Sequence, residues 1–159
     1  MYVLAGPGGT GKTQWALAYF ARKARTPEEY LALREKMLFL TCTGTNLPDV
    51  SKYVYGKHQG IVYDEGTPEM VWDNREIFQG LAEKCTVGDT HTHMYAREVC
   101  VTGCLQVITC NDWWERLEQL EPVRQEWLRA NVIVGYVPQP LYTDVDLYEW
   151  NAMGWSQSQ

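Results

Sequence analysis

The stretch GPGGTGKT, Gly6–Thr13, decides the fold because it has the spacing G-x-x-x-x-G-K-T. The apolar residues 2–5 before it predict a buried strand, and residues 13–25 (TQWALAYFARKAR) after it predict a helix. In the context of strand, glycine-rich turn and helix, this spacing indicates a phosphate-binding loop. Backbone N–H groups of such a loop point at phosphate oxygens, and the N-terminus of the following helix adds partial positive charge.

The residues of this loop have separate expected roles. Lys12 is expected to reach the β- and γ-phosphates of a nucleoside triphosphate, and the hydroxyl of Thr13 is expected to bind Mg²⁺. The sequence therefore predicts a protein that binds ATP together with Mg²⁺. The candidate nucleotide-binding residues are Gly6, Pro7, Gly8, Gly9, Thr10, Gly11, Lys12 and Thr13.

Two later strands end in polar side chains. Residues 59–66 (QGIVYDEG) contain a strand that ends at Asp64 and Glu65, and the strand over residues 104–111 ends at Asn111. Ligands of parallel sheets bind at such carboxyl ends, so these side chains are expected beside the loop. Asp64 fits a role in holding the metal, Glu65 in orienting water, and Asn111 in contacting that water or the γ-phosphate. The alternatives are a solvated acidic turn and a plain Asn-Asp turn.

The rest of the chain alternates predicted strands and helices. This alternation predicts an α/β fold in which a central, mainly parallel sheet carries helices on both faces. The 159 residues fit one domain, 1–159, in which residues 150–159 form a flexible tail. The further expected elements are helices over 26–36 (with Thr26 as its cap), 74–85 and 112–130 (broken near Pro122), strands over 36–42 and 131–137, and a hairpin or extended excursion over 87–103.

Composition limits the classes of function. The formal net charge is −6 and no long run of Lys or Arg exists, which argues against coating nucleic acid on an outer surface but not against a basic element in a groove. No apolar stretch approaches the ~18 residues of a membrane span, so no membrane partner is expected. No signal peptide is expected either. The five cysteines form no C-x-x-C pair, which predicts reduced thiols in an intracellular, reducing compartment.

Taken in order, the segments GPGGTGKTQW (6–15), YGKHQGIVYDE (55–65) and VITCN (107–111) resemble a superfamily 3 helicase. The resemblance covers residues 2–137 and is to the ATPase domain of the replication-associated (Rep) proteins of circular single-stranded DNA viruses. It implies a compact AAA+-like P-loop NTPase of three α/β/α layers that assembles as a homo-hexamer or other ring. It also implies ATP hydrolysis that drives unwinding of, or translocation on, single-stranded DNA during viral-type rolling-circle replication in a host nucleus.

The resemblance assigns roles by position. Lys12 and Thr13 match the Walker A pair of the family. Asp64 and Glu65 match its Walker B acids, and Asn111 matches its sensor asparagine. Lys12, Asp64, Glu65 and Asn111 are accordingly the expected catalytic residues, while Thr13 and Asp64 are the expected metal-binding residues.

The family also uses an arginine that the neighbouring subunit supplies to the γ-phosphate. In the sequence, this arginine follows the strand that ends in the sensor asparagine and comes just before a later strand. Arg129 has the best placement for the role, and Arg124 and Arg116 are the alternatives. A guanidinium there would stabilise charge that develops on the phosphoryl oxygens.

Between the strand that ends in the Walker B acids and the strand that ends in the sensor asparagine, the family carries a hairpin that binds DNA in the pore of the ring. The corresponding segment here is 86–103, and it lacks the lysine-glycine pair that the family usually carries there. The basic candidates for DNA binding near this segment are Lys84, His91, His93 and Arg97. No nicking endonuclease domain is expected in this chain.

Two other functions compete with the helicase interpretation. One is a small P-loop kinase that acts on a nucleoside or metabolite, but the arginines after residue 111 are too spread out for an arginine-rich lid. The other is an assembly protein that nucleotide regulates. Of the 7 tryptophans, Trp15, Trp113 and Trp114 lie near the motifs, and they are expected to serve packing rather than base stacking.

Overall fold

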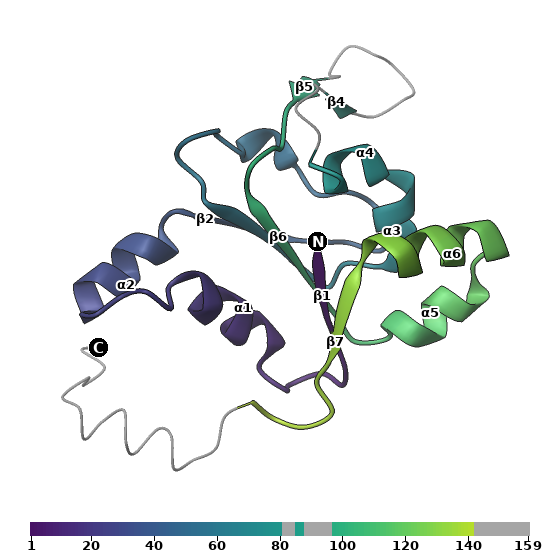
Figure 1. Cartoon of the computed structure of the whole chain (residues 1–159), viewed down its shortest axis with the longest axis horizontal. Helices are drawn as coiled ribbons and strands as arrows, with labels where there is room; N and C mark the ends of the chain where they lie inside the picture. Colours follow the sequence, from purple (N-terminus) through teal and green to yellow (C-terminus); the bar gives the residue numbers. More distant parts are fainter. Residues whose placement is uncertain (81–84, 88–96, 142–159) are drawn as a thin grey trace.

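The computed structural model describes residues 1–80, 85–87 and 97–141, with the backbone alone described at 85–87 and 97–99. Its centre is a five-stranded sheet in which every strand pair is parallel (Figure 1). Helices flank this sheet, which confirms the predicted α/β class. In spatial order the strands are β2 (Met37–Thr41), β3 (Gly60–Asp64), β6 (Leu105–Cys110), β1 (Tyr2–Ala5) and β7 (Ile133–Tyr136).

Helices cover the sheet on two sides (Figure 1). On one side α1 (Lys12–Phe20) contacts β3, β6 and the neighbouring helix α2 (Pro27–Arg34). On the other side α3 (Pro68–Asp73) contacts α5 (Trp113–Gln119) and α6 (Pro122–Asn131). The structure therefore has helix, sheet and helix layers.

The inner strands of the sheet send alternate side chains into two separate cores. On β3, Val62 belongs to the core beneath α1 together with Leu17. Its neighbours Ile61 and Tyr63 belong to the core beneath α3, α5 and α6. All three strand residues are fully buried, as expected for a central strand of a parallel sheet.

The capped helix predicted over 26–36 is confirmed as α2. The Thr26 hydroxyl accepts a hydrogen bond from the N–H of Glu29 at 3.2 Å, and Pro27 occupies the first helical position. The strand predictions and the break near Pro122 are also confirmed, because α5 ends at Gln119 and α6 begins at Pro122.

The helix predicted over 74–85 is wrong in extent. Among the described residues of this range, the helix is α4 (Arg75–Phe78), and Gly80 follows it with a positive φ of 64°, a left-handed conformation that commonly ends helices. At the other end, Cys85 already belongs to a strand. The prediction also missed α3, which precedes α4 in the chain, and a short 3₁₀ turn at Val50–Lys52.

The predicted hairpin is present as an antiparallel pair of strands, β4 (Cys85–Val87) and β5 (Arg97–Val99). The pair is separate from the central sheet. Among the described residues, no helix has both the length and the apolar character that crossing a membrane requires.

The tryptophans differ in burial. Trp113 is 1% exposed and packs in the core, as predicted. Trp15 and Trp114 are 42% and 41% exposed, so neither lies in the core of the chain. Trp15 instead stacks on Tyr19 along the outside of α1, with ring centroids 5.2 Å apart.

Gly60 lies where β3 passes close to both α1 and β6. A Cβ atom there would lie 2.2 Å from Cε1 of Phe20 and 2.8 Å from the carbonyl oxygen of Leu105, its partner in the β3–β6 ladder. We expect Gly60→Ala to lower the free energy of unfolding by about 1–3 kcal/mol, because the ladder has to shift. Urea denaturation measures this change.

The matched control is Gly135→Ala on β7, where the new Cβ would meet only ordinary contacts, the nearest being Cδ2 of Leu4 at 3.5 Å. Its effect should stay within about 0.5 kcal/mol. Equal effects at the two glycines would contradict the close approach at Gly60.

Candidate functional site

The motif residues meet at the carboxyl edge of the sheet. Ala5, the last residue of β1, pairs with Cys110 at the end of β6 and with Tyr136 at the end of β7. The connections that leave the adjacent strands β1 and β6 go to opposite faces, to α1 and to α5. Ligands of open parallel sheets bind at such a switch point, so this edge is the expected place for a site.

The loop between β1 and α1 depends on glycine at two places. Gly11 caps α1 with a φ of 82°, in the left-handed region. Gly6 has a φ of 148°, and a Cβ atom on it would lie 2.1 Å from the carbonyl oxygen of Val137. The backbone path of the loop is therefore closed to other residues at both positions.

The Lys12 side chain crosses the loop and is only 5% exposed. Its ammonium donates hydrogen bonds to the carbonyl oxygens of Gly6 and Pro7 at 2.8 and 2.7 Å. It also donates to Oδ1 of Asn111 at 3.0 Å, across 99 residues of sequence. The same cation thus joins the phosphate-loop motif to the end of β6.

Burial lowers the pKa of Lys12, while Cys110 and Asp64 act in the opposite direction without outweighing it. The ammonium therefore lies in surroundings that solvate a cation less well than water does. Electrostatic attraction is stronger where water is excluded, so an anion that reached this ammonium would be bound more tightly than at the surface.

Asp64 is the centre of a second cluster of hydrogen bonds. Its Oδ1 accepts from the hydroxyl of Thr13 at 2.6 Å and from the hydroxyl of Thr109 at 2.7 Å. The Thr109 hydroxyl in turn accepts from the N–H of Glu65 at 3.2 Å. Thr13, Asp64 and Glu65 are thereby fixed relative to one another.

Thr109 is a site residue that sequence reasoning did not assign. It is 2% exposed and lies two residues beyond Val107, on the face of β6 that packs against α1. A hydroxyl in a mainly apolar buried strand, two residues before the polar strand end, is the pattern that could have indicated it.

We expect Thr109→Val to lower the free energy of unfolding by about 1–3 kcal/mol, because it leaves the N–H of Glu65 without its acceptor and removes one donor to Asp64. Denaturant unfolding measures the loss. Thr41→Val, at an exposed position of β2, is the matched control and should be nearly neutral. A Thr109→Val protein as stable as that control would contradict the structural role.

Glu65 follows β3 directly, is exposed, and has a positive φ of 60°. Such a conformation is uncommon for a residue other than glycine. Glu65 lines a cavity of about 470 Å³ together with Lys12, Thr13, Asp64 and Asn111. The structure therefore brings the predicted residues Lys12, Thr13, Asp64, Glu65 and Asn111 to one cavity, together with residues 8–11 of the loop. The predicted nucleotide-binding residues Gly6 and Pro7 do not line it.

Arg129, which is predicted to contact the γ-phosphate of a neighbouring subunit, does not line this cavity in its own chain. Arg129 is exposed near the end of α6 and lines a separate cavity of about 160 Å³ with Trp113 and Trp114. Arg116 lies closer, in a cavity that also contains Glu65.

Both alternative arginines have acidic partners. The hydrogen bond from Arg116 to Asp112, 2.7 Å long, raises the pKa of the arginine. Arg124 pairs with Asp73 at 3.8 Å and Glu121 at 3.5 Å.

The predicted DNA-binding residues Lys84, His91 and His93 lie outside the described residues. Arg97 is in β5, where only the backbone is described. The structure therefore neither brings these four residues to the site nor separates them from it.

The cysteines near the site are neutral thiols. Cys42 and Cys110 are buried and line the cavity of about 340 Å³ that contains Glu65 and Arg116. Burial raises the pKa of each thiol to about 12, and the carboxylates of Asp64 and Glu65 add to the shift at Cys42. Neither thiol fits the role of a nucleophile at neutral pH.

No protein-family model matches this chain, and no curated protein matches it either.

Proposed function

We propose that the protein is a Mg²⁺-dependent ATPase motor of the superfamily 3 helicase type, with an AAA+-like P-loop NTPase fold. The observation that supports this proposal is the pair of contacts that join distant motif residues: Thr13 to Asp64 at 2.6 Å, and Lys12 to Asn111 at 3.0 Å. A glycine-rich turn with a purely structural role does not require polar residues from two other strands to converge on it.

The oxygen atoms near the loop fit a magnesium site. Mg²⁺ is usually held by one or two protein oxygens together with substrate phosphates and water. The hydroxyl of Thr13 and the carboxylate of Asp64 lie together at the cavity wall and would supply these protein oxygens. An ion held there would supply positive charge that offsets the negative charge of the phosphate oxygens.

The chain's own residues then have separate tasks. Backbone N–H groups of the loop and the ammonium of Lys12 bind and orient the phosphates. The Glu65 carboxylate accepts a hydrogen bond from water and orients it for attack on the γ-phosphorus. The Asn111 amide, 3.0 Å from Lys12, holds either that water or a γ-phosphate oxygen in line.

The motor part of the proposal includes a ring. Arg129 is exposed on α6 and outside its own chain's phosphate cavity, which suits a residue offered to the cavity of an adjacent copy. Single-stranded DNA is the proposed track, as in rolling-circle replication. Native mass with and without ATP tests the ring, and a change in turnover on adding single-stranded DNA tests the track.

The direct test is phosphate release from ATP by the purified protein. We expect turnover with Mg²⁺ and none after removal of the metal with EDTA, because Thr13 and Asp64 then have no ion through which to act on the phosphates. Re-addition of Mg²⁺ should restore the rate. A rate that EDTA leaves unchanged would contradict the proposal, and transfer of phosphate to an added nucleoside instead of water would favour the kinase interpretation.

A further inference from the structure

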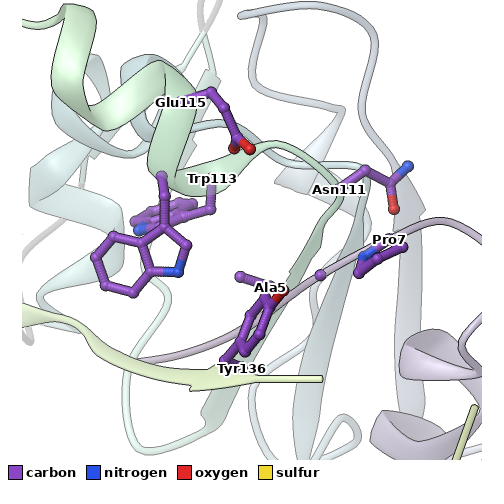
Figure 2. A pocket seen from close by; sticks show the side chains of 8 residues that line it. Ala5, Pro7, Asn111, Trp113, Glu115 and Tyr136 are labelled. Carbon is purple, nitrogen blue, oxygen red and sulfur yellow. The ribbon is translucent and has the colours of Figure 1, made fainter. Parts of the chain in front are cut away.

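A second cavity, of about 300 Å³, adjoins the start of the loop at Gly6 and Pro7. It shares Asn111 with the cavity that contains Lys12, but it opens on the side of α5. Figure 2 shows Trp113 across the open space from Pro7 and Asn111, with Tyr136 bordering the space on another side. We call this space the aromatic cavity, after its lining residues Trp113, Trp114 and Tyr136.

The aromatic walls of this cavity are open to solvent. Trp114 is 41% exposed and Tyr136 is 62% exposed, whereas Trp113 behind them is buried. A concave site with several aromatic side chains and a few polar groups is the common form of a small-ligand site. Its volume is at the lower end of the range of such sites, which limits the ligand to a small group.

The polar groups of the aromatic cavity favour a cation. Glu115 contributes a carboxylate that has no ion pair among the described side chains, and Figure 2 shows it at the border of the open space. None of the described residues that line the cavity is Lys or Arg. The whole chain carries a formal net charge of −6, which adds to the attraction for a positive ligand.

Aromatic rings attract cations through the negative faces of their π-systems, and tryptophan does so best. We propose that the aromatic cavity binds an organic cation, with an alkylammonium or guanidinium head group against Trp114 and Tyr136 and the Glu115 carboxylate as its counter-ion. The cavity shares Gly6, Pro7 and Asn111 with the proposed nucleotide site, but Trp114, Glu115 and Tyr136, which would hold the cation, have no assigned role in nucleotide binding.

Titration with choline tests the proposal, followed by the N-methyl resonance of the ligand at constant ionic strength. The control ligand is 3,3-dimethyl-1-butanol, which has nearly the same shape and no charge. We expect saturable binding of choline and at least fivefold weaker binding of the alcohol. Equal binding of the two ligands, or no saturable binding of choline or of methylguanidine, would overturn the proposal.

Variants locate the binding. Trp114→Ala should weaken choline binding about two- to fivefold, in line with cation–π energies at exposed sites. Glu115→Gln should weaken it by a similar factor, in line with the energies of exposed ion pairs. Both residues are exposed, so the substitutions should leave the fold intact, which circular dichroism checks. Trp15→Ala removes a tryptophan of equal exposure on α1 and should not change the affinity. An unchanged affinity in both cavity variants would place the binding elsewhere and overturn the assignment.

Lys12→Ala separates this inference from the proposed ATPase. Choline binding should be unchanged in that variant even though nucleotide binding is lost. Choline binding by a wild-type protein that shows no ATPase activity would support the cavity and count against the proposed function alone.

Discussion

Lys12→Ala should lower kcat/KM for ATP by about 10²–10³-fold, the effect expected when a fixed donor to a reacting oxygen is removed. The Lys12 ammonium is 5% exposed and is held by two loop carbonyls and Asn111, so it is already positioned for an anion. No other lysine or arginine lines that cavity among the described residues, so no neighbour can replace it. Steady-state phosphate release measures the loss.

The matched control is Lys23→Ala, which removes an exposed lysine just beyond α1 and should leave the rate unchanged. Circular dichroism of both variants establishes that they are folded. Turnover retained in folded Lys12→Ala protein would end the ATPase proposal, because the motif assigns the phosphates to this side chain.

Glu65→Gln should lower kcat by about 10²–10⁴-fold while ATP binding stays nearly unchanged. The amide has almost the shape of the carboxylate but cannot act as a base toward water. Glu65 is exposed, and its backbone N–H, not its side chain, makes the structural hydrogen bond to Thr109. The substitution therefore removes the carboxylate base without removing the hydrogen bond that stabilises the fold.

Single-turnover hydrolysis measures the chemical step, and a separate titration measures nucleotide binding. Together they distinguish a loss of catalysis from a loss of ATP binding. Glu69→Gln on α3 is the control, since it alters a carboxylate outside the cavity that contains Lys12. Loss of binding together with loss of turnover in Glu65→Gln would mean that this residue acts in nucleotide or metal binding, contrary to the assigned role.

Local patterns predicted most of the sheet and the glycine-rich turn between β1 and α1. The spacing from Gly6 to Thr13 specifies glycine-dependent backbone angles, and the apolar runs before Asp64 and Asn111 specify buried strands. Both signals lie within ten residues of the feature that they predict. Parallel pairing then brings the strand ends together without any further information from the side chains.

Other features depend on contacts that are distant in sequence. The crowding at Gly60 comes from Phe20 and Leu105, and the burial of Thr109 depends on its pairing with Asp64. The exposure of Trp15 arises because α1 turns that face away from the sheet. None of these contacts produces a periodic pattern in the sequence, so a single sequence does not predict them.

The missed helix α3 is different, because its signal was present. Thr67-Pro68 repeats the Thr26-Pro27 start of α2, with Met70 in place of Glu29, and the Thr67 hydroxyl accepts a hydrogen bond from the N–H of Met70 at 3.3 Å. The six-residue length of α3 left too few apolar positions for a helical period to emerge. A capping pattern is therefore more informative than periodicity for helices of one or two turns.

The contact between Lys12 and Asn111 has a mechanical consequence for the proposed motor. A triphosphate that engages the ammonium competes with the amide oxygen, so nucleotide arrival would release Asn111 from the loop. Asn111 lies two residues before α5, and α5 packs against α3 on the face of the sheet opposite α1. Nucleotide bound on the α1 face of the sheet would in this way affect helices on the opposite face, because Asn111 exchanges one hydrogen-bond partner for another. The sheet itself would not have to rearrange.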